Sequence, residues 1–238
     1  MTRPLVILVT GEPVAPARAA RGSFFDMIRR AVGDAYAGGW RELDAKGDGP
    51  FPVSGELSGV IVTGSSASVT ERAPWILRTE AWLAALVRDG TPVFGICFGH
   101  QLLGQALGGL VAQNPLGRQM GTLEAEITGE DPVLDPDARP FSVNTTHRDV
   151  VQRLPEGARV LGRTEKDPHA FVRFGPKVFG VQGHPEFDAV TMRAYVESRR
   201  AILEGEGFDV DAMLAGVHDA LPGRSVLSRF VREHVRDA

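Results

Sequence analysis

The fold is decided by one stretch of the sequence, Pro92-Val93-Phe94-Gly95-Ile96-Cys97-Phe98-Gly99-His100-Gln101. The apolar run at its start predicts a buried strand, and the following residues, Leu102 to Leu107, predict a helix. Cys97, the single cysteine of the 238-residue chain, lies between these elements with a glycine two positions away on both sides. A strand, a sharp turn and a helix in this order form a nucleophile elbow, which exposes the sulfur at the corner.

The surroundings of this cysteine favour a reactive thiol. A helix N-terminus carries partial positive charge and free N–H groups, which stabilise a thiolate relative to a thiol. A lone cysteine is usually a small buried hydrophobic residue, but Gly95 and Gly99 remove side chains from both sides of its sulfur. The sequence therefore predicts that Cys97 is a nucleophile.

A second motif supplies partners for this cysteine. Val178 to Gln182 predicts another buried strand, which leads into Gly183-His184-Pro185-Glu186-Phe187. His184 and Glu186 are two residues apart, so in an extended chain their side chains leave on the same face. A cysteine nucleophile needs a base, and the base needs a third group that orients it. We therefore predict a triad of Cys97, His184 and Glu186.

These motifs resemble those of the class I glutamine amidotransferases, the triad family. The stretches Gly95–Gln101 and Gly180–Glu186 are similar to its two hallmark motifs, and Val60–Ser66 is similar to a third. The resemblance runs in the same order from about residue 57 to residue 187, and it is strongest to free-standing chains similar to the amidotransferase part of GMP synthase. Cys97-Phe98-Gly99-His100-Gln101 and His147-Arg148-Asp149 also resemble the plant-type γ-glutamyl peptidases of the same family.

The resemblance implies an oxyanion hole made of backbone N–H groups. One N–H would come from Phe98 and another from the Gly64-Ser65 turn. Many family members have Gly-Gly-Pro where this chain has Gly64-Ser65-Ser66, and Ser65 is less free than glycine to adopt a positive φ. Because such a hole uses the backbone, we expect it to tolerate this substitution.

The resemblance also implies a substrate site. In the family, the glutamine matching Gln101 contacts the substrate, and the backbone after the histidine matching His147 holds the α-amino and α-carboxylate groups. Arg148 and Asp149 are therefore candidate substrate-binding residues. A polar helix-cap role is the alternative for Gln101. His100 is expected to be structural, because the base position is already filled.

The order of predicted elements indicates an α/β fold with a mostly parallel, twisted sheet and helices on both faces. Predicted strands cover residues 5–9, 40–43 and 59–63, and predicted helices cover 24–32 and 74–88. Short β runs at 122–128, 141–145, 159–162 and 170–174 predict a small antiparallel extension. The resemblance implies the flavodoxin-like class I amidotransferase architecture. We expect a single domain over residues 1–238, with a C-terminal helical extension from about residue 188.

Composition argues against several other classes of protein. A net charge of −4 gives no electrostatic reason to expect a nucleic acid or an anionic membrane as partner. One cysteine allows no internal disulfide, which suits a reducing cytoplasm, and the apolar run Leu5–Val9 is too short for a signal peptide. No spacing of ligand residues predicts a metal site, and no glycine-rich phosphate loop predicts a nucleotide cofactor.

The predicted reaction is hydrolysis of the γ-amide of glutamine, or of a related γ-glutamyl compound, through a thioester on Cys97. We expect no synthase within the chain, so either a separate synthase subunit receives the ammonia or the protein is a stand-alone γ-glutamyl peptidase. Two further alternatives are a different cysteine hydrolase on a similar sheet and a non-catalytic binding module on an inactive scaffold. The first class lacks a strand-end pair like His184 and Glu186, and an intact triad argues against the second.

Overall fold

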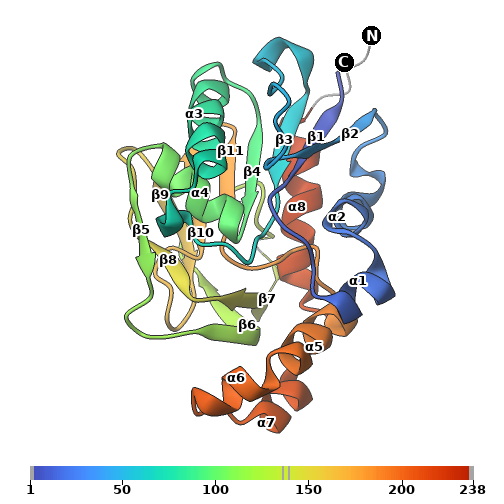
Figure 1. The fold of residues 1–238 in the computed structure, drawn as a ribbon, viewed down its shortest axis with the longest axis vertical. Helices are drawn as coiled ribbons and strands as arrows, with labels where there is room; N and C mark the ends of the chain where they lie inside the picture. The colour runs from blue at the N-terminus through green and yellow to red at the C-terminus, as the bar shows by residue number, and fades with distance from the viewer. Residues whose placement is uncertain (1–2, 136, 139, 236–238) are drawn as a thin grey trace.

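The main sheet is parallel in one half and antiparallel in the other (Figure 1). This computed structural model describes residues 3–135, 137–138 and 140–235. The parallel strands, in spatial order, are β2 (Trp40–Asp44), β1 (Leu5–Val9), β3 (Gly59–Val62), β4 (Val93–Ile96) and β11 (Val178–Val181). The antiparallel strands continue the sheet as β10 (Phe171–Gly175), β9 (Arg159–Arg163), β6 (Gln119–Ile127) and β7 (Phe141–His147). The sheet thus has the mixed architecture that the sequence predicts.

Helices cover both faces of the sheet. The elements on one face are α2 (Phe24–Val32) and α8 (Leu221–His234), and those on the other are α3 (Pro74–Arg88) and α4 (Phe98–Ala106). In β1, Leu5 and Ile7 join the first cluster, while Val6 and Leu8 join the second. Because both faces are buried, the strands are continuously apolar rather than alternating.

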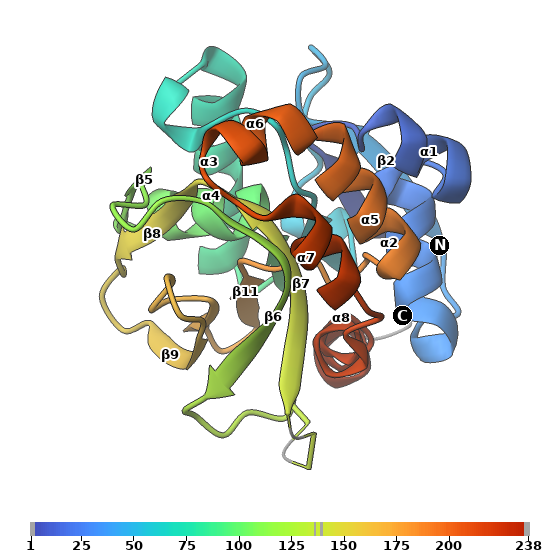
Figure 2. The same ribbon diagram turned by 90° about the horizontal axis from the view of Figure 1, so that it is seen from below.

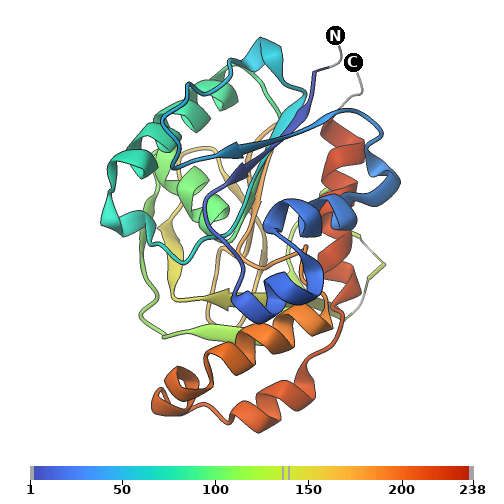
Figure 3. The ribbon, with the colours of Figure 1, turned by 45° about the vertical axis from the view of Figure 1, so that its right-hand side comes forward.

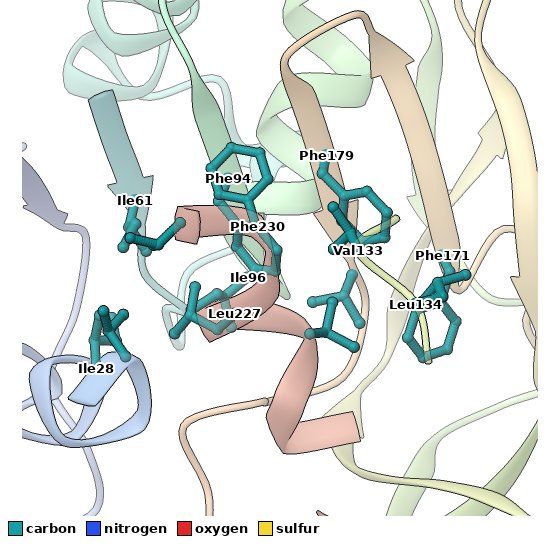
Figure 4. Close-up of a cluster of buried hydrophobic side chains, with 14 of the residues drawn as sticks. Ile28, Ile61, Phe94, Ile96, Val133, Leu134, Phe171, Phe179, Leu227 and Phe230 are labelled. Carbon is teal, nitrogen blue, oxygen red and sulfur yellow. The ribbon is translucent and has the colours of Figure 1, made fainter. Parts of the chain in front are cut away.

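Aromatic side chains fill the core between α8 and the sheet (Figure 4). Phe230 of α8 meets Phe94 of β4 edge-on, with ring centroids 5.1 Å apart. Phe94 in turn stacks against Phe179 of β11 at 5.6 Å. These contacts join β4 and β11, the two strands that lead into the predicted catalytic motifs, to one rigid core.

The helix ends follow local sequence signals. Ser23 and Asp26 form a capping box at the start of α2, because each side chain accepts a hydrogen bond from the backbone N–H of the other residue. Pro74 occupies the first turn of α3, where no intrahelical N–H is needed. Single 3-10 turns occur at η1 (Gly33–Ala35), η2 (Ser54–Glu56) and η3 (Val69–Glu71). The predicted helices therefore begin and end where the caps place them.

A second, two-stranded sheet and an N-terminal helix were not predicted. The sheet pairs β5 (Leu110–Gln113) with β8 (Asp149–Arg153), and the helix is α1 (Ala15–Arg21). The chain passes from β7 to β8 through Arg148 alone. The candidate motif at residues 147–149 therefore lies at the crossing between the two sheets.

The segment after Phe187 contains α5 (Ala189–Ser198), α6 (Arg200–Gly205), α7 (Val210–Gly216) and α8. Figures 1 and 2 show α5, α6 and α7 beyond one end of the parallel strands, whereas α8 returns to the face of the sheet. In Figure 3, α5 lies against α1, and Met192 and Tyr195 of α5 share a buried cluster with Ala17 of α1. Within the described part of the chain, no helix combines the length and apolarity that crossing a membrane requires.

Candidate active site

Cys97 occupies a strained turn between β4 and α4. Its backbone has φ 50° and ψ −101°, a conformation that side-chain-bearing residues rarely adopt. A Cβ on Gly99 would lie 2.5 Å from the carbonyl oxygen of Val62, and one on Gly95 would lie 2.6 Å from the backbone of Gly99. The two glycines therefore let α4 pack tightly on β3 and β4.

The expectation of an exposed sulfur was wrong. Cys97 is only 6% exposed, although it lines a cavity. The absence of side chains on Gly95 and Gly99 prevents clashes between the helix and the sheet, but it does not uncover the sulfur. Thr146 and Gln182 lie next to the sulfur and help to bury it. The sulfur lies 3.8 Å from the carbonyl oxygen of Thr146.

His184 and Glu186 form a buried pair beyond the end of β11. The Nδ1 atom of His184 donates to Oε1 of Glu186 at 2.8 Å, and the imidazole stacks on Phe187 at 4.1 Å between centroids. Burial alone lowers the pKa of His184, but the carboxylate of Glu186 and the sulfur of Cys97 favour the imidazolium and raise that pKa above its ordinary value. The pair is therefore arranged to keep a positive charge next to Cys97.

Gly64 lies beside both Cys97 and the imidazole of His184. A Cβ at this position would be 2.8 Å from Cε1 of His184 and 3.8 Å from Cβ of Cys97. The Nε2 atom of His184, the ring nitrogen opposite Glu186, is buried without a hydrogen-bond partner among the described residues. This nitrogen is the atom that a base and acid role would use.

Ser65 occupies its turn without the strain that its substitution for glycine suggested. Among the described non-glycine residues only Arg72, Cys97 and Ala220 have a positive φ. The hydroxyl of Ser65 donates to the carbonyl of Thr10 at 2.9 Å. Ser65, Ser66 and Phe98 line the same cavity as Cys97. As a first residue of α4, Phe98 has an N–H group without an intrahelical partner.

Two glutamine side chains connect the substrate motif to the sulfur. The Nε2 group of Gln101 donates to the carbonyl of Asp149 at 2.7 Å and to Oε1 of Gln182 at 3.1 Å. The Nε2 group of Gln182 in turn donates to Sγ of Cys97 at 3.5 Å. Gln101 therefore braces the site rather than capping its helix. Gln182 was not predicted as a site residue, although its place two residues before His184 was the available signal.

The motif at residues 147–149 is held by its backbone. Asn114 donates its N–H to the carbonyl of Arg148 at 2.8 Å, and Nδ1 of His147 donates to the carbonyl of Asp149 at 3.1 Å. Burial lowers the pKa of His147 to about 4, so this imidazole is neutral at neutral pH. The carboxylate of Asp149 accepts a hydrogen bond from the hydroxyl of Ser68. Arg148 and Asp149 both line the Cys97 cavity.

The cavity has a volume of about 370 Å³. Two of its lining residues, Arg118 and Arg199, were not predicted from the sequence. A larger hollow of about 730 Å³ lies along β6 and β9 and contains none of the predicted site residues. His100 is fully buried beside Phe174, and burial lowers its pKa to about 3, so it remains neutral.

No group of three or more His, Cys, Asp or Glu side chains is arranged to hold a metal in the part of the chain that the structure describes. Cys97, Gln101 and two arginines line the cavity, and the imidazole of His184, with its carboxylate partner, interacts with Cys97. This combination suits covalent catalysis at a carbonyl carbon.

Comparisons with known proteins give the family. A family model described as glutamine amidotransferase class-I matches residues 49–202. A GMP synthase (glutamine-hydrolyzing) from Aeropyrum pernix is 40% identical over 144 residues, which is 60% of this chain and 26% of that one. Gamma-glutamyl peptidase 5 from Arabidopsis thaliana is 28% identical over 179 residues, 71% of this chain and 70% of that one.

The solved structures agree on the fold. A glutamine amidotransferase from Thermotoga maritima superposes with a TM-score of 0.70 at 23% identity, covering 95% of this chain and 98% of that one. The chain spans about a quarter of the length of the GMP synthase that it resembles. Because the family model matches more than half of its residues, the chain belongs to the class-I glutamine amidotransferase family.

Proposed function

We propose that this protein is a cysteine-dependent amidohydrolase that cleaves the γ-amide of glutamine through a thioester on Cys97. The observation that carries this proposal is the buried pair of His184 and Glu186, joined at 2.8 Å, whose imidazole interacts with the sulfur of Cys97. A thiolate and an imidazolium in this relation are the reactive form of a cysteine nucleophile.

In the proposed reaction, the sulfur of Cys97 attacks the γ-carbonyl carbon and a C–S bond forms. The negative oxygen that develops is stabilised by N–H groups of Phe98 and of the Gly64-Ser65 turn. His184 then gives its proton to the departing nitrogen as the C–N bond breaks. Water attacks the thioester, His184 accepts a proton from it, and glutamate leaves.

The ammonia acceptor distinguishes two forms of this function. In the first, ammonia passes to a separate synthase subunit, and the match to a GMP synthase supports this form. In the second, the chain hydrolyses γ-glutamyl peptides without a partner. The match to a gamma-glutamyl peptidase over 71% of the chain supports this second form.

Turnover of the purified chain tests the proposal. Glutamine and a panel of γ-glutamyl peptides are supplied, and glutamate release is followed with and without a cell extract as a source of synthase. We expect release from at least one donor, with loss of almost all activity in a Cys97→Ala variant. Stimulation of glutamine turnover by the extract would support the ammonia-donor form, and fast peptide turnover without stimulation would support the peptidase form.

A further inference from the structure

A guanidinium from the C-terminal helices reaches the Cys97 cavity. Arg199 lies at the junction of α5 and α6, and its side chain lines the same cavity as Cys97. It donates a hydrogen bond to the hydroxyl of Thr146. It also stacks over Tyr195, with 5.1 Å between its Cζ atom and the ring centroid. Two contacts therefore fix the direction of this side chain.

The charge of Arg199 has no carboxylate partner among the described residues. Arg118, in the same cavity, differs, because Glu206 accepts two hydrogen bonds from it at 2.7 and 3.0 Å. Burial lowers the pKa of Arg199 from its ordinary value, yet a guanidinium stays charged in proteins. The groups that favour its charge are Tyr195 and the sulfur of Cys97, and neither is a carboxylate, so this partly buried cation suits an anionic group of a ligand.

The neighbours of Arg199 indicate which part of a substrate it meets. The ring of Tyr195, over which it stacks, lies 6.5 Å from the ring of His184. The carbonyl of Thr146, whose hydroxyl holds the guanidinium, faces the sulfur of Cys97. Arg199 is thus linked through one neighbour to the imidazole and through another to the sulfur, the two groups between which the departing nitrogen would lie.

Resting on the proposed thioester chemistry, we propose that Arg199 binds a carboxylate on the leaving amine, so that γ-glutamyl amino acids are preferred over simple γ-glutamyl amides. The C–N bond of the donor breaks as the C–S bond to Cys97 forms, and the proton of His184 moves to the nitrogen. The free amino acid leaves with its carboxylate still paired to Arg199. Water then releases glutamate and restores the thiol.

Two donors that differ in one group test this assignment. In γ-glutamylglycine the leaving amine carries a carboxylate, and in γ-glutamylglycinamide that carboxylate is a neutral amide. For the wild-type chain we expect kcat/KM to be at least about tenfold higher for the acid, as a charge-assisted hydrogen bond would give. In Arg199→Gln the ratio should fall to about one, because kcat/KM should fall much further for the acid than for the glycinamide.

Arg200→Gln is the matched control. It removes the same charge from the next residue, which faces solvent and pairs with Glu197 at 3.0 Å, and it should leave the ratio unchanged. Arg199→Lys keeps the positive charge but lacks the planar guanidinium with its paired N–H donors. Its ratio of kcat/KM for the acid to kcat/KM for the glycinamide should therefore lie between those of the wild type and Arg199→Gln. If Arg199→Gln does not fold, the lysine variant carries the test.

Three results would overturn the assignment. One is a wild-type ratio near one, another is an unchanged ratio in the lysine variant, and the third is an equal loss on both donors in Arg199→Gln. That equal loss would place Arg199 on the γ-glutamyl part common to the donors. Failure of the wild-type chain to hydrolyse any γ-glutamyl donor would instead refute the proposed function itself.

Discussion

Cys97 and His184 both lie beside Gly64, and the charge of the imidazole depends on Glu186. Burial opposes a charged imidazole, so the carboxylate is needed to keep the proton on the ring. The sulfur of Cys97 accepts a further hydrogen bond from the amide of Gln182 at 3.5 Å. At the scale of single residues, the site is therefore a small buried cluster whose charge is set by its own side chains.

The pH dependence of activity follows from the raised pKa of His184. A raised pKa means that the imidazolium persists as pH rises past about 6.5, the ordinary value for histidine, and is lost only at higher pH. We expect the alkaline limb of kcat/KM for wild type to lie well above pH 7. Glu186→Gln removes the main charge that favours the imidazolium, so its alkaline limb should move to lower pH and kcat should fall by at least about tenfold.

Measured rates between pH 5 and pH 10 decide this prediction, with donor concentration varied at each pH. A measurable residual rate is expected in Glu186→Gln, because the carboxylate orients the base and does not transfer protons itself. Identical alkaline limbs in the two proteins would show that Glu186 does not control the charge of His184.

At the scale of elements, the site depends on how closely α4 approaches β3 and β4. The missing side chains of Gly95 and Gly99 create this contact, and the strained turn at Cys97 follows from it. Hydrogen bonds also tie α4 to segments distant in the sequence. Gln101 of α4 donates to the backbone of Asp149, the first residue of β8, and to the side chain of Gln182, which itself donates to the sulfur of Cys97. The elbow is thus held by packing on one side and by amides on the other.

Gly99→Ala tests the packing of the elbow. The added Cβ would lie 2.5 Å from the carbonyl oxygen of Val62, a backbone atom that cannot rotate away. We expect the free energy of unfolding to fall by about 1–3 kcal/mol, as for other overpacked cores. Chemical denaturation followed by circular dichroism measures this change. Gly55→Ala is the control, since a Cβ there meets nothing within 4 Å; equal effects of the two changes would contradict the account.

At the scale of the whole molecule, the sequence predicted the parallel strands and the helices that cover them better than it predicted the outer strands. Continuous apolar runs and glycine turns are local signals, so the parallel strands and helices α2, α3 and α4 lie within a few residues of their predicted positions. The short strands β5 and β8 carry no such signal, because β5 is partly exposed and begins just after two glycines. The antiparallel strands were predicted, but their ends were shifted by up to three residues for β6.

The candidate site was predicted in part for the same reason. Cys97, His184 and Glu186 stand within compact motifs, and the structure brings them together. Arg199 stands in a segment without a motif, and it meets Thr146 only because α5 packs against β6 and β7 beyond one end of the parallel strands. Contacts between segments 53 residues apart leave no local pattern, so only the folded chain reveals them.

The most direct measurement of the central claim is the detection of the acyl-enzyme. The chain is mixed with a γ-glutamyl donor, quenched in acid during turnover and mapped by mass spectrometry after proteolysis. We expect a γ-glutamyl group on the peptide that contains Cys97, and no adduct and almost no turnover in Cys97→Ala. Donor hydrolysis at the wild-type rate by Cys97→Ala, with no adduct on the wild-type peptide, would contradict this claim.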